Sequence, residues 1–152
     1  MPDAPLVSAI VVSYNVRALL VDTLRSLYAN TEVPVEAIVV DNDSEDGSAD
    51  AVAEQFPQAK LIRSPENLGF GKANNLGFQH VSGRFVLLLN PDVVLDPGCV
   101  DRLADFLFVH PEAGAVGPRL RRPDGKLLKG AGYRPPEVAR VVREQLEVAA
   151  AS

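Results

Sequence analysis

The sequence predicts an α/β fold in which helices cover both faces of a mostly parallel sheet. Apolar, β-branched runs of strand length alternate with segments whose apolar residues follow helical spacing. These runs lack the polar alternation of a strand that faces water, as expected of parallel strands buried on both faces. A length of 152 residues and a hydrophobic content of 47% fit one domain with one core.

Four strands are expected, each followed by a helix. The strands are expected at 7–13, 35–40, 60–64 and 85–89. The helices are expected at 17–28, from 48 to just before Pro57, at 70–81 and from Asp96-Pro97 to Val109. The last strand, with the sequence FVLLL, is the most apolar, and we expect it to be the most buried.

Two of these helices carry capping signals. Ser48 is a suitable N-cap, and Asp96-Pro97 supplies a cap and a first-turn proline. The helix that follows Pro97 is expected to bury an apolar stripe made of Val100, Leu103, Phe106 and Leu107.

The formal net charge of −5 argues against a general nucleic-acid binder, which carries a basic field. The charge is uneven, because residues 119–134 hold six basic groups and one acid. The sequence has neither the positive flank of a secretory signal nor an apolar run long enough to cross a bilayer. We therefore expect a cytoplasmic protein without a nucleic-acid partner.

Polar residues collect where the expected strands end, and these residues form the candidate site. In open parallel α/β sheets, ligands bind outside the carboxyl ends of the strands. The candidates are Ser13, Tyr14 and Asn15 after the first strand, Asp41 and Asn42 after the second, Asn67, Gly69, Phe70 and Asn74 after the third, and Asn90 and Asp92 after the fourth.

The glycines of this region do not fit two common phosphate-binding motifs. Gly69 and Gly71 match the first two glycines of a dinucleotide fingerprint, but Asn74 stands where close helix packing needs the third. Gly71-Lys72 also lacks the following hydroxyl residue and the earlier glycine of a P-loop. NAD binding and ATP hydrolysis are therefore disfavoured.

Asp41 ends a buried strand, where a carboxylate is costly unless a polar group meets it. It can accept a hydrogen bond from the ring N–H of a polar heterocycle, and Asn42 beside it can donate or accept. The neighbouring residues Asp43, Glu45, Asp46 and Ser48 are better explained by turning the chain and capping the next helix.

Asp92, in the turn Asn90-Pro91-Asp92, suits a divalent cation that also binds diphosphate. An ordinary Asn-Pro turn with a solvated carboxylate is an equal alternative.

The segment 67–74 can place backbone N–H groups and amides against phosphate or ribose. It can also form an ordinary turn followed by a helix that Gly77 and two asparagines weaken.

Taken in order, these motifs resemble the inverting family 2 glycosyltransferases, and most closely the rhamnosyltransferase-like branch that acts on cell-surface polysaccharides. The matching stretches are VVSYN (11–15), VDNDSEDGS (40–48), NLGFGKANNLG (67–77) and LLNPD (88–92), with weaker matches at 116–118 and 123–125. The resemblance covers residues 6 to about 134 and rests on four motifs in the same order.

The resemblance implies a glycosyltransferase-A (Rossmann-like) three-layer fold and a nucleotide-diphosphate sugar as donor, with a glycan or lipid-linked acceptor. It implies that Ser13, Tyr14 and Asn15 line the nucleoside pocket and that Asp41 binds the base, with Asn42 beside it. It places Asn67, Gly69, Phe70 and Asn74 along the nucleotide. Asn90 and Asp92 stand where the family's Asp-x-Asp motif binds ribose, metal and diphosphate, so Asp92 is the implied ligand of Mg²⁺ or Mn²⁺.

The family's second half, with the acceptor site and the acidic general base, is not evident in the sequence. We therefore expect an incomplete form of the fold, with a nucleotide-diphosphate-sugar-binding domain at 1–134 and a helix or tail at 135–152. No general base is identified, because Glu137, Glu144 and Glu147 have the positions of solvated helix residues. Without a base, transfer loses a factor of about 10² to 10⁴. The apolar stripe of the closing helix predicts a homo-oligomer.

Other interpretations stay open. A binding module of the same fold holds a nucleotide or nucleotide-sugar without transferring it. A domain of the receiver or flavodoxin type uses Asp41 as a phosphorylation site, although a receiver needs acids directly after its first strand. The basic segment 119–134 steers the diphosphate, contacts anionic lipid at the inner face of a membrane, or is a solvated hairpin that turns at Pro123-Asp124-Gly125. Of these three, the sequence favours the hairpin.

Overall fold

The computed structural model describes residues 4–127 and contains the expected alternation of strands and helices. The strands are β1 (Val7–Ser13), β2 (Val35–Asp41), β3 (Lys60–Arg63) and β4 (Phe85–Leu89). The helices are α1 (Arg17–Ala29), α2 (Ser48–Gln55), α3 (Gly69–Phe78) and α4 (Cys99–Val109). The chain divides into two compact units, residues 1–116 and 117–152, and all of these elements belong to the first unit.

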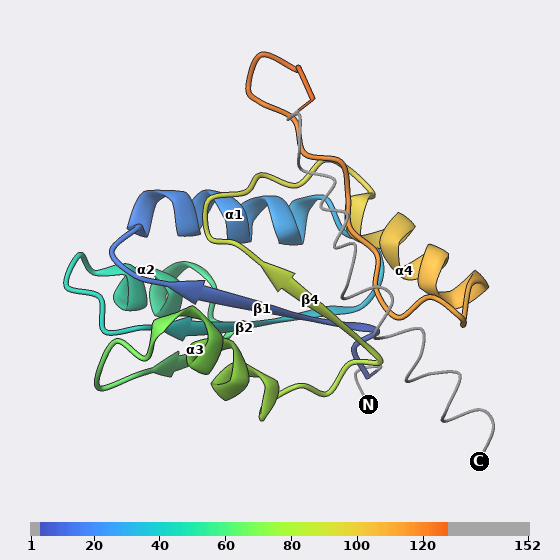
Figure 1. Cartoon of the computed structure of the whole chain (residues 1–152). Helices are drawn as coiled ribbons and strands as arrows, with labels where there is room; N and C mark the ends of the chain where they lie inside the picture. Colours follow the sequence, from blue (N-terminus) through green and yellow to red (C-terminus); the bar gives the residue numbers. More distant parts are fainter. Residues whose placement is uncertain (1–3, 128–152) are drawn as a thin grey trace. The chain divides into compact units, whose positions relative to one another are not determined.

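The strands form one parallel sheet in the order β3-β2-β1-β4 (Figure 1). β1 lies between β2 and β4, with Val7 opposite Val35 at one end and Ser13 opposite Asp41 at the other. Because the strands all run in the same direction, their carboxyl ends lie at one edge of the sheet. The polar segments that follow the strands therefore begin at that edge, as the sequence predicts.

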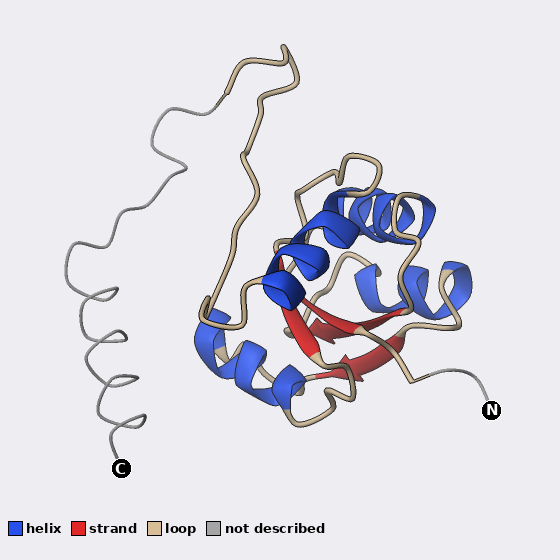
Figure 2. Cartoon of the chain, turned by 90° about the vertical axis from the view of Figure 1, so that its right-hand side faces the viewer, coloured by secondary structure: helices blue, strands red, loops and turns tan. Residues whose placement is uncertain are grey.

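Helices lie on both faces of the sheet, as expected (Figure 2). One face carries the larger core, in which α1, α2 and α4 pack on apolar side chains of β1 and β2. Leu20, Leu24 and Leu27 of α1 are fully buried in this core, at the spacing that the sequence predicts. The predicted three-layer α/β arrangement is therefore present.

The other face is covered by α3, which packs on β1 and β2 through Ala73. Gly77 allows the close approach of this helix, because a Cβ at that position would lie 2.6 Å from Cγ2 of Ile10. Ile10 is fully buried. The glycine that weakens α3 as an isolated helix is thus required by its packing on the sheet.

The expectation that β4 is the most buried strand is wrong. Every residue of β1 is buried, whereas Val86 and Leu88 on β4 are 38% and 52% exposed. The reason is the position of β4 at the end of the sheet, beyond the strands on which α3 packs. An apolar composition therefore did not indicate where the strand lies in the sheet order.

The predicted starts of two helices also need correction. Ser48 is the first residue of α2 rather than its N-cap; the N-cap is Gly47, in the left-handed conformation with φ +77°. Similarly, α4 begins at Cys99 and not at Pro97, after Gly98 with φ +67°. In both places a glycine turns the chain into the helix, and the N-cap residue makes no side-chain hydrogen bond to the first turn.

Phe106 was expected to be buried, but it is 43% exposed and lies against His110 with a ring separation of 4.4 Å. The buried side of α4 is centred on Val100 and Ala104, which are one helical turn apart. Phe106 comes two residues after Ala104 and therefore points to the opposite side of the helix.

In the second unit the structure describes residues 117–127, which form the predicted hairpin. Arg121 pairs with Leu127 in an antiparallel bridge, and the turn between them contains Pro123, Asp124 and Gly125. The predicted domain boundary at 134, the closing helix and its three glutamates lie outside the described residues. Within the described part of the chain, no helix has the length and apolar character needed to cross a membrane.

Candidate functional site

A hollow of about 390 Å³ opens at the carboxyl edge of the sheet. This volume lies within the range of small-molecule sites, about 300 to 1,000 Å³. Segments that follow β1, β2, β3 and β4 all contribute to it. The lining residues are Val12, Tyr14, Val16, Leu19, Asn42, Asn67, Gly69, Phe70, Asn90, Pro91 and Asp92.

Most of the predicted site residues come together around this hollow. Those that line it are Tyr14, Asn42, Asn67, Gly69, Phe70, Asn90 and Asp92. Those that do not line it are Ser13, Asn15, Asp41 and Asn74. What each residue binds remains a prediction.

The hollow also has an apolar wall that the sequence analysis missed, formed in part by Val16 and Leu19. Polar residues at the strand ends do not reveal this wall. One signal was available, because Leu19 lies off the buried stripe of α1 and is 48% exposed. A leucine off the buried stripe, in the first turn of the helix that follows a polar strand end, was the available signal.

Ser13 and Asp41 are buried neighbours at the ends of β1 and β2, 0% and 4% exposed. Oδ2 of Asp41 accepts a hydrogen bond from the N–H of Ser44 at 3.2 Å. Within the described residues, Oδ1 of Asp41 and Oγ of Ser13 have no hydrogen-bond partner. Leaving a buried polar atom without a partner costs about 1–3 kcal/mol, so each atom would be stabilised by a polar partner, although neither residue lines the hollow.

Asn42 holds the loop before α3 against the end of β2. Its Nδ2 donates to Oδ1 of Asn67 at 2.8 Å, and its Oδ1 accepts the N–H of Leu68 at 2.8 Å. Oδ1 of Asn67 in turn accepts the N–H of Gly69 at 2.9 Å. The side-chain amides of Asn42 and Asn67 therefore hold the start of α3 in place, whether or not they also contact a ligand.

A second set of hydrogen bonds joins the loops that follow β1 and β2. The N–H of Asn15 donates to Oγ of Ser44 at 3.0 Å, and Oδ1 of Asn15 accepts the N–H of Glu45 at 2.8 Å. Asn15 has φ +53°, which an asparagine tolerates better than most residues. These bonds place Asn15 beside the hollow as a residue that orders the loops.

Asp46 has the chain-turning role that the sequence predicts. Burial raises its pKa, but hydrogen bonds from the Ser48 hydroxyl and from the N–H groups of Arg17 and Ser48 together outweigh burial and lower the pKa below its ordinary value. The carboxylate therefore connects the start of α1 to the start of α2.

The start of α3 borders the hollow through Gly69 and Phe70. Gly69 has φ +73°, a conformation that favours glycine. A Cβ at Gly69 or Gly71 would meet no protein atom within 4 Å, so space beside this backbone is open. The amino end of a helix favours anions, because its first N–H groups and its dipole point outward.

Asn74 lies further along α3, and its side chain is used within the helix. It is 6% exposed, and its Nδ2 donates to the carbonyl oxygen of Phe70 at 2.8 Å. A direct contact between Asn74 and a nucleotide therefore remains a prediction that this geometry does not favour.

Asp92 is the one charged residue among those that line the hollow. Among the residues that the structure describes, no three His, Cys, Asp or Glu side chains gather where they could hold a metal ion. A divalent cation at Asp92 would therefore take most of its ligands from its substrate and from water. Mg²⁺ commonly binds in this way, through one or two carboxylates and phosphate oxygens.

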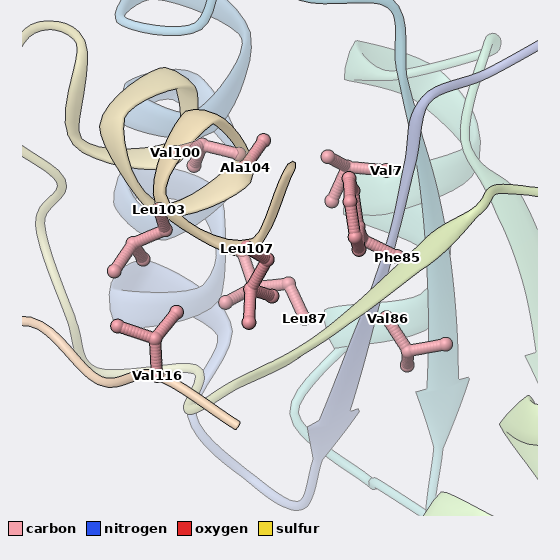
Figure 3. Close-up of a pocket in the computed structure, with 9 residues that line it drawn as sticks. All are labelled: Val7, Phe85, Val86, Leu87, Val100, Leu103, Ala104, Leu107 and Val116. Carbon is pink, nitrogen blue, oxygen red and sulfur yellow. The ribbon is translucent and has the colours of Figure 1, made fainter. Parts of the chain in front are cut away.

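A separate cavity of about 50 Å³ lies between β4 and α4 and is lined by apolar residues only (Figure 3). Its walls are formed by Val7, Phe85, Val86, Leu87, Val100, Leu103, Ala104, Leu107 and Val116. With no polar side chain in its lining, it offers no group for recognition or catalysis. The hollow at the carboxyl edge is therefore the candidate site.

Comparison with known proteins identifies the family of the chain. The model of the family described as "Glycosyl transferase family 2" matches residues 8–149. An N-acetylglucosaminyl-diphospho-decaprenol L-rhamnosyltransferase of Mycobacterium tuberculosis is 35% identical over 123 residues, which cover 74% of this chain and 40% of that protein. The succinoglycan biosynthesis protein ExoO of Rhizobium meliloti is 34% identical over 112 residues, covering 73% of this chain and 31% of that protein.

Solved structures show the same relationship. S. aureus TarS 1-349 in complex with UDP-GlcNAc has a TM-score of 0.63 and 28% identity, covering 69% of this chain and 32% of that chain. The mannosyltransferase PcManGT of Pyrobaculum calidifontis, in complex with GDP-Man and Mn²⁺, has a TM-score of 0.62 and 29% identity, covering 81% of this chain and 37% of that chain. The chain thus spans about two fifths or less of the length of these proteins. The expected glycosyltransferase-A fold is confirmed, and the chain belongs to glycosyl transferase family 2.

Proposed function

We propose that this chain binds the donor of an inverting glycosyltransferase, which transfers a sugar from a nucleotide-diphosphate sugar to a glycan or lipid-linked acceptor. The observation that carries the proposal is the hollow at the carboxyl edge of the sheet, together with the unpartnered Oδ1 of Asp41 and Oγ of Ser13 beside it. The related rhamnosyltransferase and the TarS complex with UDP-GlcNAc support this donor class.

In this proposal Asp41 and Ser13 recognise the base, because a carboxylate can accept a ring N–H and a hydroxyl can donate or accept. Tyr14 and Phe70, which are 50% and 59% exposed, provide flat apolar surfaces at the rim of the hollow. The amino end of α3 faces the diphosphate, where its N–H groups favour negative charge.

We propose Mg²⁺ or Mn²⁺ as the cofactor, held by Asp92 with Asn90 beside it. The donor chemistry fits, since an acidic carboxylate is the only charge in the lining and would repel a diphosphate that arrived without a cation. When bound, such an ion stabilises the negative charge of the leaving diphosphate. PcManGT was solved with Mn²⁺, which supports the same class of ion.

A second candidate function is a binding module that holds the nucleotide-sugar without transferring it. Among the described residues that line the hollow, Asp92 is the one acid, and it is assigned to the metal rather than to the role of general base. We therefore propose that transfer by this chain alone is weak. We also propose that the protein works at the cytoplasmic face of a membrane in polysaccharide synthesis. We further propose that it forms a homo-oligomer through residues 135–152.

Calorimetric titration with UDP, dTDP and GDP, each with and without Mn²⁺, tests donor binding. We expect one of these nucleotides to bind the unmodified chain. Asp41→Ala should weaken binding about tenfold or more with or without metal, because a hydrogen bond to a charged group contributes about 1.5–3 kcal/mol. Asp92→Ala should remove only the increase in affinity that Mn²⁺ provides.

Asp105→Ala, which removes an exposed carboxylate of α4, is the matched control and should bind like the unmodified chain. If none of the three nucleotides binds under either condition, donor binding is wrong. Once binding is seen, assays of sugar hydrolysis and transfer separate the enzyme from the binding module.

A further inference from the structure

The hairpin at 119–127 concentrates positive charge in an otherwise acidic chain. It holds Arg119, Arg121, Arg122 and Lys126 against one acid, Asp124, while the whole chain has a formal net charge of −5. All residues from 117 to 127 are exposed. These cations are therefore presented to solvent at one short stretch of the chain.

The backbone of the hairpin is fixed by a tight turn. The N–H of Gly125 donates to the carbonyl of Arg122 at 2.9 Å, and the N–H of Arg122 donates to the carbonyl of Lys126 at 2.8 Å. Gly125 has φ +79°, as expected for a three-residue hairpin loop that ends in the left-handed conformation. Oδ1 of Asp124 accepts the N–H of Lys126 at 3.0 Å. Binding would therefore cost little backbone entropy.

The turn places two like charges opposite each other. Arg122 and Lys126 flank the loop on facing strands, where like charges destabilise a hairpin. Asp124, the one acid among residues 117–127, gives little relief: its Oδ2 lies 4.0 Å from Nζ of Lys126, and the two side chains are 52% and 81% exposed. An anion bound between the two strands would remove this repulsion.

Two leucines accompany the cations. Leu120 and Leu127 are 39% and 52% exposed. Basic residues beside exposed apolar side chains are typical of segments that lie at the surface of an anionic bilayer. Surfaces that bind single-stranded nucleic acid add aromatic rings on which bases stack, and residues 117–127 contain no aromatic residue.

We propose that the hairpin at 119–127 docks the chain on an anionic lipid surface, with Arg122 and Lys126 binding lipid phosphates and Leu120 and Leu127 contacting the acyl boundary. None of these residues is among those that line the candidate donor site. The proposal agrees with the lipid-linked acceptor of the proposed function. Its test needs no nucleotide, so its failure and the failure of donor binding are distinguishable.

The test is flotation of the full 152-residue chain with vesicles of phosphatidylglycerol and phosphatidylcholine, and with vesicles of phosphatidylcholine alone. We expect binding to the anionic vesicles only, and weaker binding as salt is raised, because salt screens exposed charges. Each basic residue near an anionic surface contributes about 1 kcal/mol, or about fivefold in partitioning. Arg122→Gln with Lys126→Gln should therefore weaken binding about 25-fold.

The control variant is Arg25→Gln with Arg102→Gln, which removes the same charge from exposed residues of α1 and α4. It should retain at least a third of the binding of the unmodified chain. A separate variant, Leu120→Ser with Leu127→Ser, should lower binding while leaving its salt dependence unchanged. Circular dichroism of each variant checks that the fold is intact.

Three results would overturn the proposal. The first is equal binding to neutral and anionic vesicles, and the second is an equal loss in the control variant, which would indicate an effect of net charge alone. The third is binding of inorganic diphosphate or of a single-stranded RNA oligomer to the hairpin without binding to vesicles. A further result would support the proposal: the protein binds anionic vesicles when diphosphate is absent, and added diphosphate displaces it. That result would show that the protein recognises phosphate groups at the bilayer.

Discussion

Glu36 joins the amino ends of the strands, opposite the candidate site. Its Oε1 accepts hydrogen bonds from the Ser8 hydroxyl and, at 2.8 Å each, from the N–H and the hydroxyl of Ser82. Ser8 is fully buried, and its Oγ also accepts the N–H of Gly83 at 2.8 Å. A Cβ on Gly83 would lie 2.7 Å from the backbone nitrogen of Ser8, so this corner leaves no room for a side chain.

These contacts predict a pH dependence of stability. Burial raises the pKa of Glu36, but the hydrogen bonds from Ser8 and Ser82 outweigh burial and hold the pKa below its ordinary value. A lowered folded-state pKa stabilises the protein above the unfolded-state pKa, near pH 4.3, and this stability is lost as the pH falls through the folded-state value. Glu36→Gln should therefore lower the free energy of unfolding by about 1 kcal/mol at pH 7, the low end for charged hydrogen bonds because the carboxylate is partly exposed.

Urea denaturation at pH 7 and pH 3 measures this effect. The difference between Glu36→Gln and the unmodified chain should shrink at pH 3, because the stability that comes from the lowered folded-state pKa is lost as the pH falls below the unfolded-state pKa. Glu54→Gln, at an exposed position of α2, should change stability little at either pH. A loss for Glu36→Gln that is the same at both pH values would contradict the role assigned to the charge.

At the scale of elements, α3 both borders the candidate site and packs on the sheet. Its first residues, Gly69 and Phe70, border the hollow, and its later residue Gly77 lies against the sheet. The two glycines Gly71 and Gly77 have opposite surroundings, since a Cβ at Gly71 would meet no atom within 4 Å and one at Gly77 would meet Ile10 at 2.6 Å.

This contrast predicts opposite effects of the same substitution. Gly77→Ala should lower the free energy of unfolding by about 1–3 kcal/mol, the usual cost of overpacking a core. Gly71→Ala should raise it by about 0.5 kcal/mol, because alanine reduces the entropy of the unfolded chain and fits an open helical position. Urea denaturation of both variants measures the pair. Equal effects of the two substitutions would mean that the packing of α3 on Ile10 is not as described.

At the scale of the molecule, the core belongs to the first unit. Both clusters of buried apolar residues lie between Leu6 and Ala104. Each element of the parallel sheet is also within residues 1–116. The first unit therefore contains the interactions that a stable fold requires.

A chain that ends at Pro118 is accordingly expected to fold. Its midpoint of urea denaturation should lie close to that of the full chain, because every buried core residue among those that the structure describes is retained. Its nucleotide binding should also be retained, whereas its binding to anionic vesicles should be lost with the hairpin. An unfolded product, seen by circular dichroism, would show that residues after Pro118 are needed for the fold.

Local patterns determined the elements of this protein and the candidates for its site. The apolar runs located all four strands to within a residue or two, because a buried parallel strand is continuously apolar. The polar strand ends identified residues such as Tyr14, Asn67 and Asp92, which the parallel sheet brings to one edge and which line one hollow. Order along the chain was sufficient here because parallel strands end on the same side.

Tertiary structure decided what depends on neighbours distant in sequence. It placed the apolar β4 at the end of the sheet, with Leu88 exposed, because the order β3-β2-β1-β4 is set by strand pairing and not by hydrophobicity. It showed that Gly77 is needed for packing, because only the close approach of α3 to Ile10 leaves no room for a side chain at that position. It also left Oδ1 of Asp41 buried and, within residues 4–127, without a hydrogen-bond partner, because burial is a property of the assembled sheet and not of the residue.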